Sequence, residues 1–346
     1  MDLLIYETDY TLIGIVDTAS SVIWANRFRQ CGDFEIYVPA SAQLLELLTL
    51  GRAVGRSDDD MLGIIERVEI TTDEESGDYM IVTGRCMRSI LDRRIVWDQT
   101  IFSGTVENGL RKLVTDAYIS PTDPDRKYEL LTLAAAHGYT ERTRLQNTGT
   151  VLLDAIEERC AAHNLGFKIT LGSKKLVLDF YKGSDRSADQ SLLPRLIFSE
   201  DFDNLTASHY VRDQSAYKTV ALIAGEGEGA ARKKTTVSKS ADTVGLARRE
   251  MYIDARDIST NDGEISDSEY AEMLAERGSS ELQSAAVEES MEGSVEAGQM
   301  HTYKVDYFLG DTVTVINKYG IVANAQVLEV IETWDENGYT CTPTFG

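Results

Sequence analysis

The chain has 346 residues, of which 42% are hydrophobic and 26% are charged, a composition typical of a folded globular protein. Its 57 acidic side chains outnumber its 34 basic ones, which gives a net charge of −23 at pH 7. Because nucleic-acid affinity comes mostly from Lys and Arg contacts to phosphates, this charge excludes a general DNA- or RNA-binding role. An acidic surface suits a conduit that repels DNA, and it also keeps a protein soluble. The length predicts about two domains.

The four cysteines, Cys31, Cys86, Cys160 and Cys341, are widely spread. Cys160 and His163 stand three residues apart on a predicted helix, but two ligands do not make a structural zinc site. We therefore expect buried or free thiols. The N-terminus lacks the pattern of a signal peptide, and no apolar run approaches the ~18 residues that span a bilayer. The sequence thus predicts a soluble protein made in a cytoplasm, with no membrane-spanning segment.

Residues 1–100 are predicted to form an N-terminal β domain. Apolar-rich runs separated by turns indicate strands at residues 12–16, 22–28, 34–38, 64–71 and 79–86. A short apolar segment lies at residues 44–50, and residues 73–78 form an acidic hairpin tip. Such a set of short strands suits a small barrel or sandwich, and we predict a barrel.

Residues 101–190 change character and predict an α+β insert. Thr105 is a suitable N-cap for one helix, and a second helix begins at Thr150. Gly166 stands where a C′ glycine would end that second helix. Alternating apolar residues at 167–171 and 176–180 then predict a β-hairpin.

Residues 191–253 predict a second β region, with strands at 196–198 and 219–224 followed by a glycine-rich, then basic loop at 225–239. We interpret that loop as a mobile connection. Residues 254–300 are strongly acidic and predict a helical segment, because Ser266 and Glu269 form a capping box. This segment is expected to be one helix, or two broken at Gly278, exposed on most of its circumference.

Residues 301–346 return to strand character and are predicted to complete a barrel. Alternation at 303–309 and an apolar run at 313–316 indicate two strands. Asn337-Gly338 is a strong hairpin signal between residues 326–334 and 339–344.

Residues 225–230 fit the G-x-G-x-x-A variant of the dinucleotide fingerprint. However, Glu226 and Glu228 would place carboxylates against a pyrophosphate, and no amphipathic helix follows to hold the phosphates. Residues 257–264 resemble a calcium loop, but Asp262 occupies the position of the obligatory glycine. The sequence therefore predicts no cofactor and no metal site.

The acidic runs Asp58-Asp59-Asp60 and Glu74-Glu75 have the residue types of a glycosidase pair, but both fall at predicted exposed turns where nothing raises a pKa. No G-x-S-x-G elbow is found. The four histidines are scattered without a companion motif: His137, His163, His209 and His301. We predict no catalytic residue.

Several segments, in order along the chain, resemble the siphophage tail hub family, also called tail-associated or baseplate hub proteins. They include Gly-Asp-Phe-Glu-Ile at 32–36, Leu-Asp-Arg-Arg-Ile-Val-Trp at 91–97 with Gly-Thr-Val-Glu at 104–107, and Gly-Glu-Gly-Glu-Gly-Ala-Ala-Arg at 225–232. Tyr-Ile-Asp-Ala-Arg-Asp-Ile at 252–258 and the close at 307–315 and 342–346 complete the set. Together these segments cover nearly the whole chain.

The resemblance implies a mainly β, α+β fold in which two tube-like β-barrel domains carry an α+β insert and an acidic helical segment and assemble as a ring. It implies a homotrimer at the virion tail tip, assembled in the host cytoplasm, that adapts the hexameric tail tube to a trimeric tip. The partners would be the distal tail protein ring, the tail tube protein, the tape measure, and fibre or spike proteins. DNA would only pass through the lumen.

Many relatives append a hydrolase domain, whereas this chain ends at Gly346, directly after its last predicted strand. Lytic activity is therefore expected in another subunit. Two alternatives stay open: a cell-wall or polysaccharide hydrolase that uses the acidic pairs, and a receptor-binding module. The latter requires clustered exposed aromatic residues, and we expect Trp24, Trp97 and Trp334 in the core.

Overall fold

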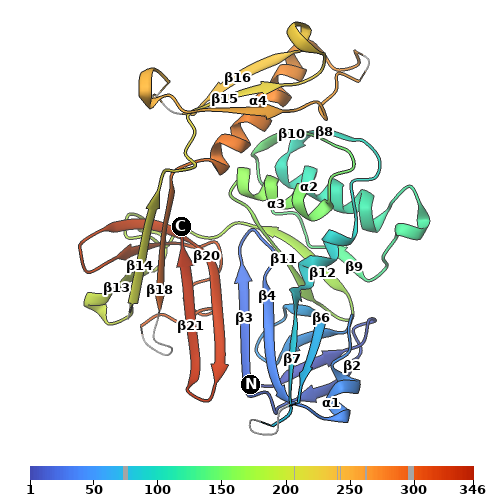
Figure 1. The fold of residues 1–346 in the computed structure, drawn as a ribbon, viewed down its shortest axis with the longest axis vertical. Coiled ribbons are helices and arrows are strands. Elements are labelled where there is room, and N and C mark those ends of the chain that lie inside the picture. The colour runs from blue at the N-terminus through green and yellow to red at the C-terminus, as the bar shows by residue number, and fades with distance from the viewer. Residues whose placement is uncertain (73–76, 206, 240, 242, 262, 295–299) are drawn as a thin grey trace.

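The computed structural model describes residues 1–346 except 73–76, 206, 240, 242, 262 and 295–299. Strands account for 40% of the chain and helices for 21%, which confirms the expected mainly β class. Figure 1 shows two groups of strands side by side, a helical insert beside them and a small sheet with a helix above. Among the described residues, no helix is long and apolar enough to span a bilayer.

The N-terminal strands form an antiparallel set in the order β4-β7-β6-β5-β1-β2. On β4 the apolar residues Phe34, Ile36 and Val38 are buried while their neighbours are not, as the alternation predicts. The apolar segment at 44–50 contributes a short helix, α1, capped by the Ser41 side chain. The elements are β1 (Leu3–Tyr6), β2 (Leu12–Val16), β3 (Ser21–Arg27), β4 (Asp33–Pro39), α1 (Ala42–Leu47), β5 (Ala53–Arg56), β6 (Leu62–Thr71) and β7 (Tyr79–Cys86).

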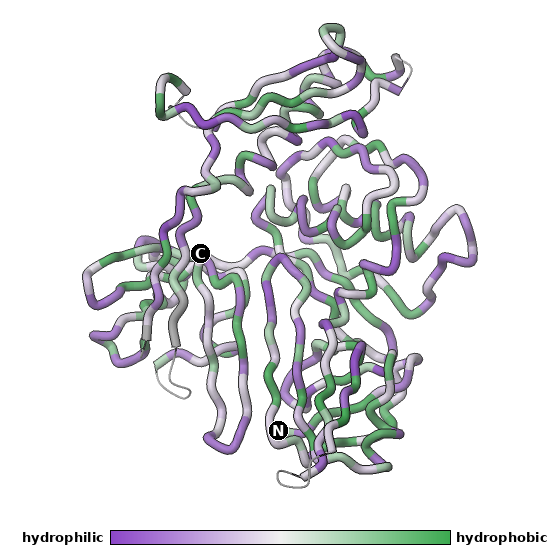
Figure 2. Tube along the Cα trace, viewed as in Figure 1, coloured by the Kyte–Doolittle hydropathy of each residue, from purple (hydrophilic) through white to green (hydrophobic). Residues whose placement is uncertain are grey.

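The C-terminal strands join this set directly, because β20 pairs with β21 on one side and with β3 on the other. The β20–β21 turn at Asn337-Gly338 is confirmed, and Figure 2 shows that it is hydrophilic. This group comprises β13 (Ile197–Ser199), β14 (Ala207–Asp213), β18 (Glu288–Ser294), β19 (Thr312–Ile316), β20 (Val322–Asp335) and β21 (Gly338–Phe345). A turn of 3₁₀ helix, η4 (Glu200–Phe202), follows β13.

The result is one sheet that runs from β14 at one end to β2 at the other. In the described residues its two ends do not pair, so the expected closed barrels are not found. The reason lies in the central contact, where the N- and C-terminal strands join edge to edge through β3 and β20 instead of each set closing on itself. Both chain ends therefore belong to one sheet, and among the described strands β14 and β2 stand at the ends of its main path while β13 ends a branch through β19.

The insert contains both predicted helices, and Thr105 caps α2 as expected. Gly166 does not end α3: the helix stops at Ala162, Asn164 takes the positive φ, and Gly166 begins β11. The predicted β-hairpin is confirmed as β11 and β12. The elements are η1 (Met87–Arg93), β8 (Thr100–Thr105), α2 (Val106–Val114), a π-helical turn η2 (Thr115–Ile119), η3 (Pro124–Arg126), β9 (Leu131–Leu133), β10 (Arg142–Asn147), α3 (Leu152–Ala162), β11 (Gly166–Leu171) and β12 (Leu176–Tyr181).

A separate three-stranded sheet in the order β16-β15-β17 packs against α4. The basic part of the 225–239 loop is not a mobile connection, because it forms β16 and pairs with β15. Helix α4 is a single helix with the predicted capping box, yet it buries Tyr270, Met273, Leu274 and Leu282, so it is less exposed than expected. The acidic segment also contains β18, which its composition did not indicate. The elements are β15 (Val220–Ala224), η5 (Gly229–Ala231), β16 (Lys234–Ser238), η6 (Gly245–Ala247), β17 (Glu250–Asp254) and α4 (Asp267–Ser284).

The alternation at residues 303–309 does not produce a strand. Lys304 has a φ of 67° and Tyr303 meets Tyr307 only in an isolated bridge, so the segment folds as a tight turn. Tyr303, Tyr307 and Leu309 are still buried, in the C-terminal core. The apolar pattern therefore identified three core residues correctly, but Val305 of the same pattern is 71% exposed and the predicted backbone was wrong.

Candidate functional site

The junction between the two strand groups is held by a buried network of four charges. The Arg56 guanidinium lies 2.9 Å from Glu332 and 2.8 Å from Asp59. The Lys304 ammonium lies 2.7 Å from Asp59 and 3.1 Å from Glu332. Two cations and two carboxylates thus meet in the space between β5, β20 and the 303–309 turn, and the half-exposed Asp58 adds a third carboxylate 3.3 Å from Arg56. A buried charge is tolerated only when it is paired in this way.

Aromatic rings complete this junction. The Arg56 guanidinium carbon lies 4.6 Å from the Trp334 ring centroid and 5.4 Å from that of Trp24, so the cation is held between two indoles of adjacent strands. The Tyr339 hydroxyl donates to Glu332 at 3.0 Å. Burial raises the pKa of the Asp59 carboxyl, but Lys304 and Arg56 outweigh it and hold that pKa below its usual value. Asp59 is therefore ionised near neutral pH.

This position corrects one sequence-based expectation. Asp59 does not lie at an exposed turn, because its side chain is only 5% exposed, whereas Asp58 is 49% exposed. The second acidic run, Glu74-Glu75, lies outside the described residues. Asp59 is paired with two cations in the junction.

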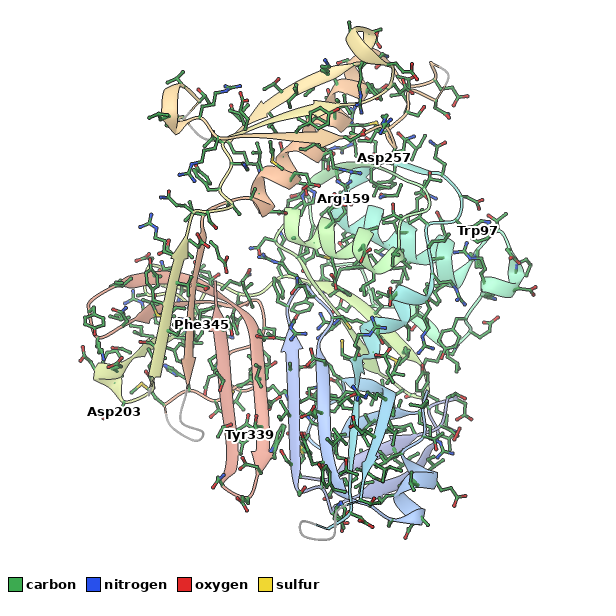
Figure 3. The ribbon with its side chains drawn as sticks, in the orientation of Figure 1. Trp97, Arg159, Asp203, Asp257, Tyr339 and Phe345 are labelled. Carbon is green, nitrogen blue, oxygen red and sulfur yellow. The ribbon has the colours of Figure 1, made fainter. Side chains whose placement is uncertain are left out.

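The insert is anchored to the sheet by a second buried cation. Arg88 donates to the backbone carbonyl oxygens of Arg27 at 2.7 Å and Phe167 at 3.0 Å, which joins β3 to β11. On its other side the insert meets α4 through Glu276, which accepts from the backbone of Arg144 at 2.8 Å and pairs with Arg159 at 3.4 Å. Figure 3 shows Arg159 at this boundary. The four parts of the fold are therefore connected by polar contacts as well as by packing.

The open edge of the sheet at β2 exposes apolar side chains. Leu12, Ile13 and Ile15 are 49%, 40% and 58% exposed, and in the described residues β2 pairs only with β1. The opposite end of the sheet is β14. An unpaired edge strand with apolar side chains is a template for pairing with another chain, and proteins otherwise protect such edges. This edge is the candidate assembly site of the chain.

The glycine-rich loop does not form a phosphate cradle. Glu226 accepts hydrogen bonds from Ser259 and Thr260 at 2.6 to 2.8 Å, and its backbone N–H donates to the Tyr270 hydroxyl at 2.7 Å. The loop thus docks onto the segment that resembled a calcium loop, in which Asp257 pairs with Arg277 at 3.0 Å. Among the residues that the structure describes, no three His, Cys, Asp or Glu side chains gather as a metal site.

The histidines whose contacts are described have structural partners. His137 lies 3.0 Å from Asp179, and His163 lies 3.8 Å from Glu276. The ring of His301 packs edge-on against Phe198. Each of these three histidine rings therefore contacts another side chain of the fold.

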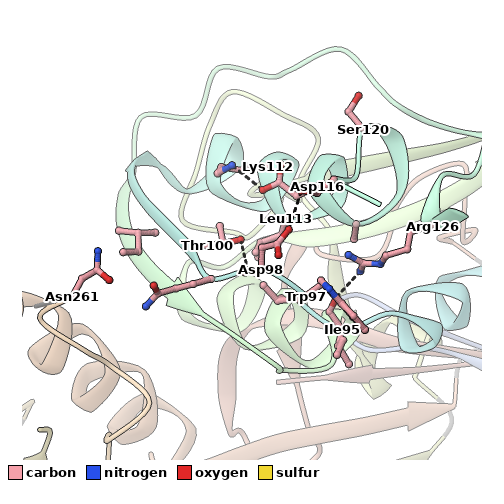
Figure 4. Close-up of a pocket in the computed structure, with 15 residues that line it drawn as sticks. Ile95, Trp97, Asp98, Thr100, Lys112, Leu113, Asp116, Ser120, Arg126 and Asn261 are labelled. Carbon is pink, nitrogen blue, oxygen red and sulfur yellow. Dashed lines mark hydrogen bonds and ion pairs between the residues drawn. The ribbon is translucent and has the colours of Figure 1, made fainter. Parts of the chain in front are cut away.

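A cavity of about 500 Å³ opens on the insert around Trp97 (Figure 4). Trp97 is 60% exposed, so the expectation that it lies in the core was wrong, whereas Trp24 is buried as expected. Arg126 stacks on the indole with 5.3 Å between guanidinium carbon and ring centroid, and Asp98 accepts from Thr122 at 2.9 Å. The lining thus combines an aromatic ring with hydroxyl, carboxylate and cationic side chains.

Comparison with known proteins identifies the family of this chain. Residues 2–346 match the family described as siphovirus ReqiPepy6 Gp37-like protein. The chain belongs to this family of siphovirus tail proteins. The resemblance to siphophage tail proteins is thereby confirmed. No curated protein matches the sequence.

Solved structures of tail proteins share the fold. The 43 kDa tail protein of prophage MuSo2 from Shewanella oneidensis is 13% identical, with a TM-score of 0.63 over 100% of this chain and 98% of that one. The tail protein from Neisseria meningitidis MC58 is also 13% identical, with a TM-score of 0.61 over 99% and 95%. Prophage tail protein gp18 from Listeria monocytogenes EGD-e is 12% identical, with a TM-score of 0.56 over 100% and 94%. At these identities the comparison shows a common fold.

Proposed function

We propose that this siphovirus tail protein is the structural hub at the distal end of the tail. Three copies form a ring that adapts the hexameric tail tube to a trimeric tip, lines the DNA channel and anchors fibres or a spike. The distal tail protein ring, the tube protein and the tape measure are its further partners. The chain performs no catalysis, and its action is mechanical.

The observation that carries this proposal is the open sheet. The β3–β20 pairing and the Arg56 network fix both chain ends in one rigid unit, while β2 leaves apolar side chains unprotected. Because an edge of this kind attracts a further strand, closing the sheets of several copies into a ring covers it. The family and the shared fold of three tail proteins support the same assignment.

The charge of the chain supports the role of a channel. With a net charge of −23 per copy, a ring repels the phosphates of DNA, which favours sliding over adhesion. A protein that gripped DNA at this position would oppose its ejection.

The substitution Ile15→Lys tests the proposed edge. Ile15 is 58% exposed, so a lysine is tolerated by the free chain but places a charge in the covered edge of a ring. We expect the variant to remain folded and to dissociate to single chains in sedimentation velocity experiments. The matched control is Leu192→Lys, at a position that is 93% exposed on a loop away from β2, which should leave assembly unchanged. A ring that survives Ile15→Lys and dissociates with Leu192→Lys would refute the assignment of the edge.

A further inference from the structure

Two cysteines that are far apart in the sequence lie in contact. The sulfur atoms of Cys31 and Cys86 are 3.2 Å apart, which is closer than the van der Waals contact of two sulfurs. Cys31 lies in the turn between β3 and β4, and Cys86 is the last residue of β7. Both are free thiols in this structure. A disulfide bond requires that the sulfurs approach by only about 1.1 Å more.

The surroundings of the pair differ from those of an inert buried thiol. Cys86 is buried, and its sulfur accepts from the backbone N–H of Gly32 at 3.1 Å and from the Arg88 guanidinium at 3.4 Å. Burial raises the pKa of the Cys86 thiol, but the Cys31 hydrogen bond and Arg88 outweigh it and lower that pKa well below its usual value. Cys31 is partly exposed and its pKa is raised, first by its hydrogen bond to Cys86 and then by burial. The pair thus combines a stabilised thiolate with an accessible sulfur.

The main chain that carries the two cysteines is held by close contacts. Gly32, between Cys31 and β4, runs so close to β3 that an added Cβ would lie 2.1 Å from the carbonyl oxygen of Ala25. The N–H of Cys86 donates to the Gly32 carbonyl at 2.8 Å, and the N–H of Cys31 donates to the Glu157 carboxylate of α3 at 2.9 Å. These contacts keep the two main-chain segments next to each other at the distance that a disulfide needs.

We propose that Cys31 and Cys86 are an oxidation site that forms an intramolecular disulfide when the protein meets a hydroperoxide. The bond closes a loop across β4 to β7 and joins the β3–β4 turn to the beginning of η1. Since Cys31 also contacts α3 through Glu157, the cross-link stiffens the boundary between the N-terminal strands and the insert. This inference does not depend on ring assembly.

The chemistry balances in two steps that follow a proton transfer. Cys31 passes its proton to the Cys86 thiolate that it contacts. The resulting Cys31 thiolate attacks one oxygen of the hydroperoxide, the O–O bond breaks, and Cys31 becomes a sulfenic acid while the departing oxygen takes a proton from solvent and leaves as water or an alcohol. The Cys86 sulfur then attacks the sulfenic sulfur; the S–S bond forms, and the departing hydroxide takes the Cys86 proton to become water. Two thiols are oxidised, and one peroxide supplies the two-electron oxidant.

Peptide mapping tests this proposal on the full-length protein. The purified chain is treated with hydrogen peroxide, remaining thiols are blocked with iodoacetamide in denaturant, and the protein is digested with trypsin. Cleavage after Arg29, Arg52, Arg85 and Arg88 gives one peptide of residues 30–52 and one of residues 86–88. We expect these two peptides linked, lighter by two hydrogen atoms than their sum, while Cys160 and Cys341 are recovered alkylated.

Two cysteine variants distinguish a specific Cys31–Cys86 disulfide from unspecific oxidation of thiols. Cys31→Ser should abolish the linked pair and leave Cys86 recoverable as an alkylated thiol. Cys341→Ser removes a buried thiol elsewhere and should leave the link unchanged. Recovery of the two peptides as separate alkylated or sulfonic acid species, or a link from either cysteine to Cys160, overturns the proposal.

Discussion

The role of Arg56 depends on side chains that are close to it in the fold, most of which are distant in the sequence. Its side chain is fully buried, its charge is paired with two buried carboxylates and with the half-exposed Asp58, and its guanidinium group lies over two indole rings. Such a group stabilises the fold only as long as each partner stays in place, because an unpaired buried charge is costly. The junction between the strand groups should therefore be sensitive to single substitutions.

The substitution Arg56→Met keeps much of the side-chain length and removes the charge. It leaves Glu332 and Asp59 with Lys304 as their only cation in the network, so the free energy of unfolding should fall by about 3–5 kcal/mol in urea titrations. The control is Arg67→Met, which removes an exposed ion pair with Glu69 and should cost less than about 1 kcal/mol. Equal losses in the two variants would contradict the importance of the buried network.

Asp59 should contribute to stability in a pH-dependent way. Its folded pKa is lowered, so its contribution is present above the unfolded value of about 3.9 and is lost as the pH falls through the folded pKa. The difference in free energy of unfolding between the wild type and Asp59→Asn should therefore be largest at neutral pH and shrink below about pH 4. The control substitution is Asp17→Asn, which removes a carboxylate from an exposed loop. A difference independent of pH would argue against an ionised Asp59.

Sequence reasoning could not find this network. Asp59 is one of three consecutive aspartates that look like a solvated run. Of its two cationic partners, Arg56 lies three residues before it, but Lys304 lies more than 240 positions away in the chain. Trp97 shows the opposite error, since an apolar residue beside a strand was assigned to the core and is exposed. Only the fold determines which member of a charged run turns inward and which tryptophan faces solvent.

At the scale of elements, the β6–β7 hairpin contains a bulge that depends on a glycine. The register shifts between Ile65 and Arg67, and Gly84 of β7 stands opposite Ile65. A Cβ added at Gly84 would lie 1.8 Å from the backbone carbonyl oxygen of Ile64 and 2.9 Å from the Phe34 ring. A backbone oxygen in the sheet cannot move as a flexible side chain can. The bulge at this position therefore requires a residue without a side chain at Gly84.

The substitution Gly84→Ala should destabilise the protein by about 3 kcal/mol, at the upper end of the usual cost of overpacking. The control is Gly172→Ala in the β11–β12 turn, where an added Cβ meets its nearest atom at an ordinary contact of 3.4 Å, and a change below about 1 kcal/mol is expected. Thermal or urea denaturation of both variants provides the measurement. A harmless Gly84→Ala would show that β6 can move away from β7.

The periodicity of apolar residues predicted most strands and both helices of the insert, because burial of alternate residues is a local property. The periodicity gave wrong predictions where the backbone conformation depends on something other than apolar alternation. Asn164 adopts the left-handed conformation that we assigned to Gly166, so α3 ends earlier. Residues 303–309 alternate like a strand but turn at Lys304. The polar, basic sequence of β16 has almost no apolar signal, since only one of its faces is covered by α4.

At the scale of the whole molecule, the pairing of β3 with β20 is the decisive contact. It joins strands separated by about 300 residues, and the ion pair of Arg27 with Glu329 at 2.6 Å lies within it. The sequence indicated strands at both chain ends, but no pattern within either segment specifies this register. The contact converts two groups of strands into one sheet whose edges stay open, and it is these edges that the proposed ring requires.

Electron microscopy of the purified full-length protein, combined with its mass in solution, tests this account most directly. The account predicts rings with three-fold symmetry and a mass three times the 38.4 kDa of one chain. Particles that remain single chains at every concentration tested, or rings of another symmetry, would contradict it.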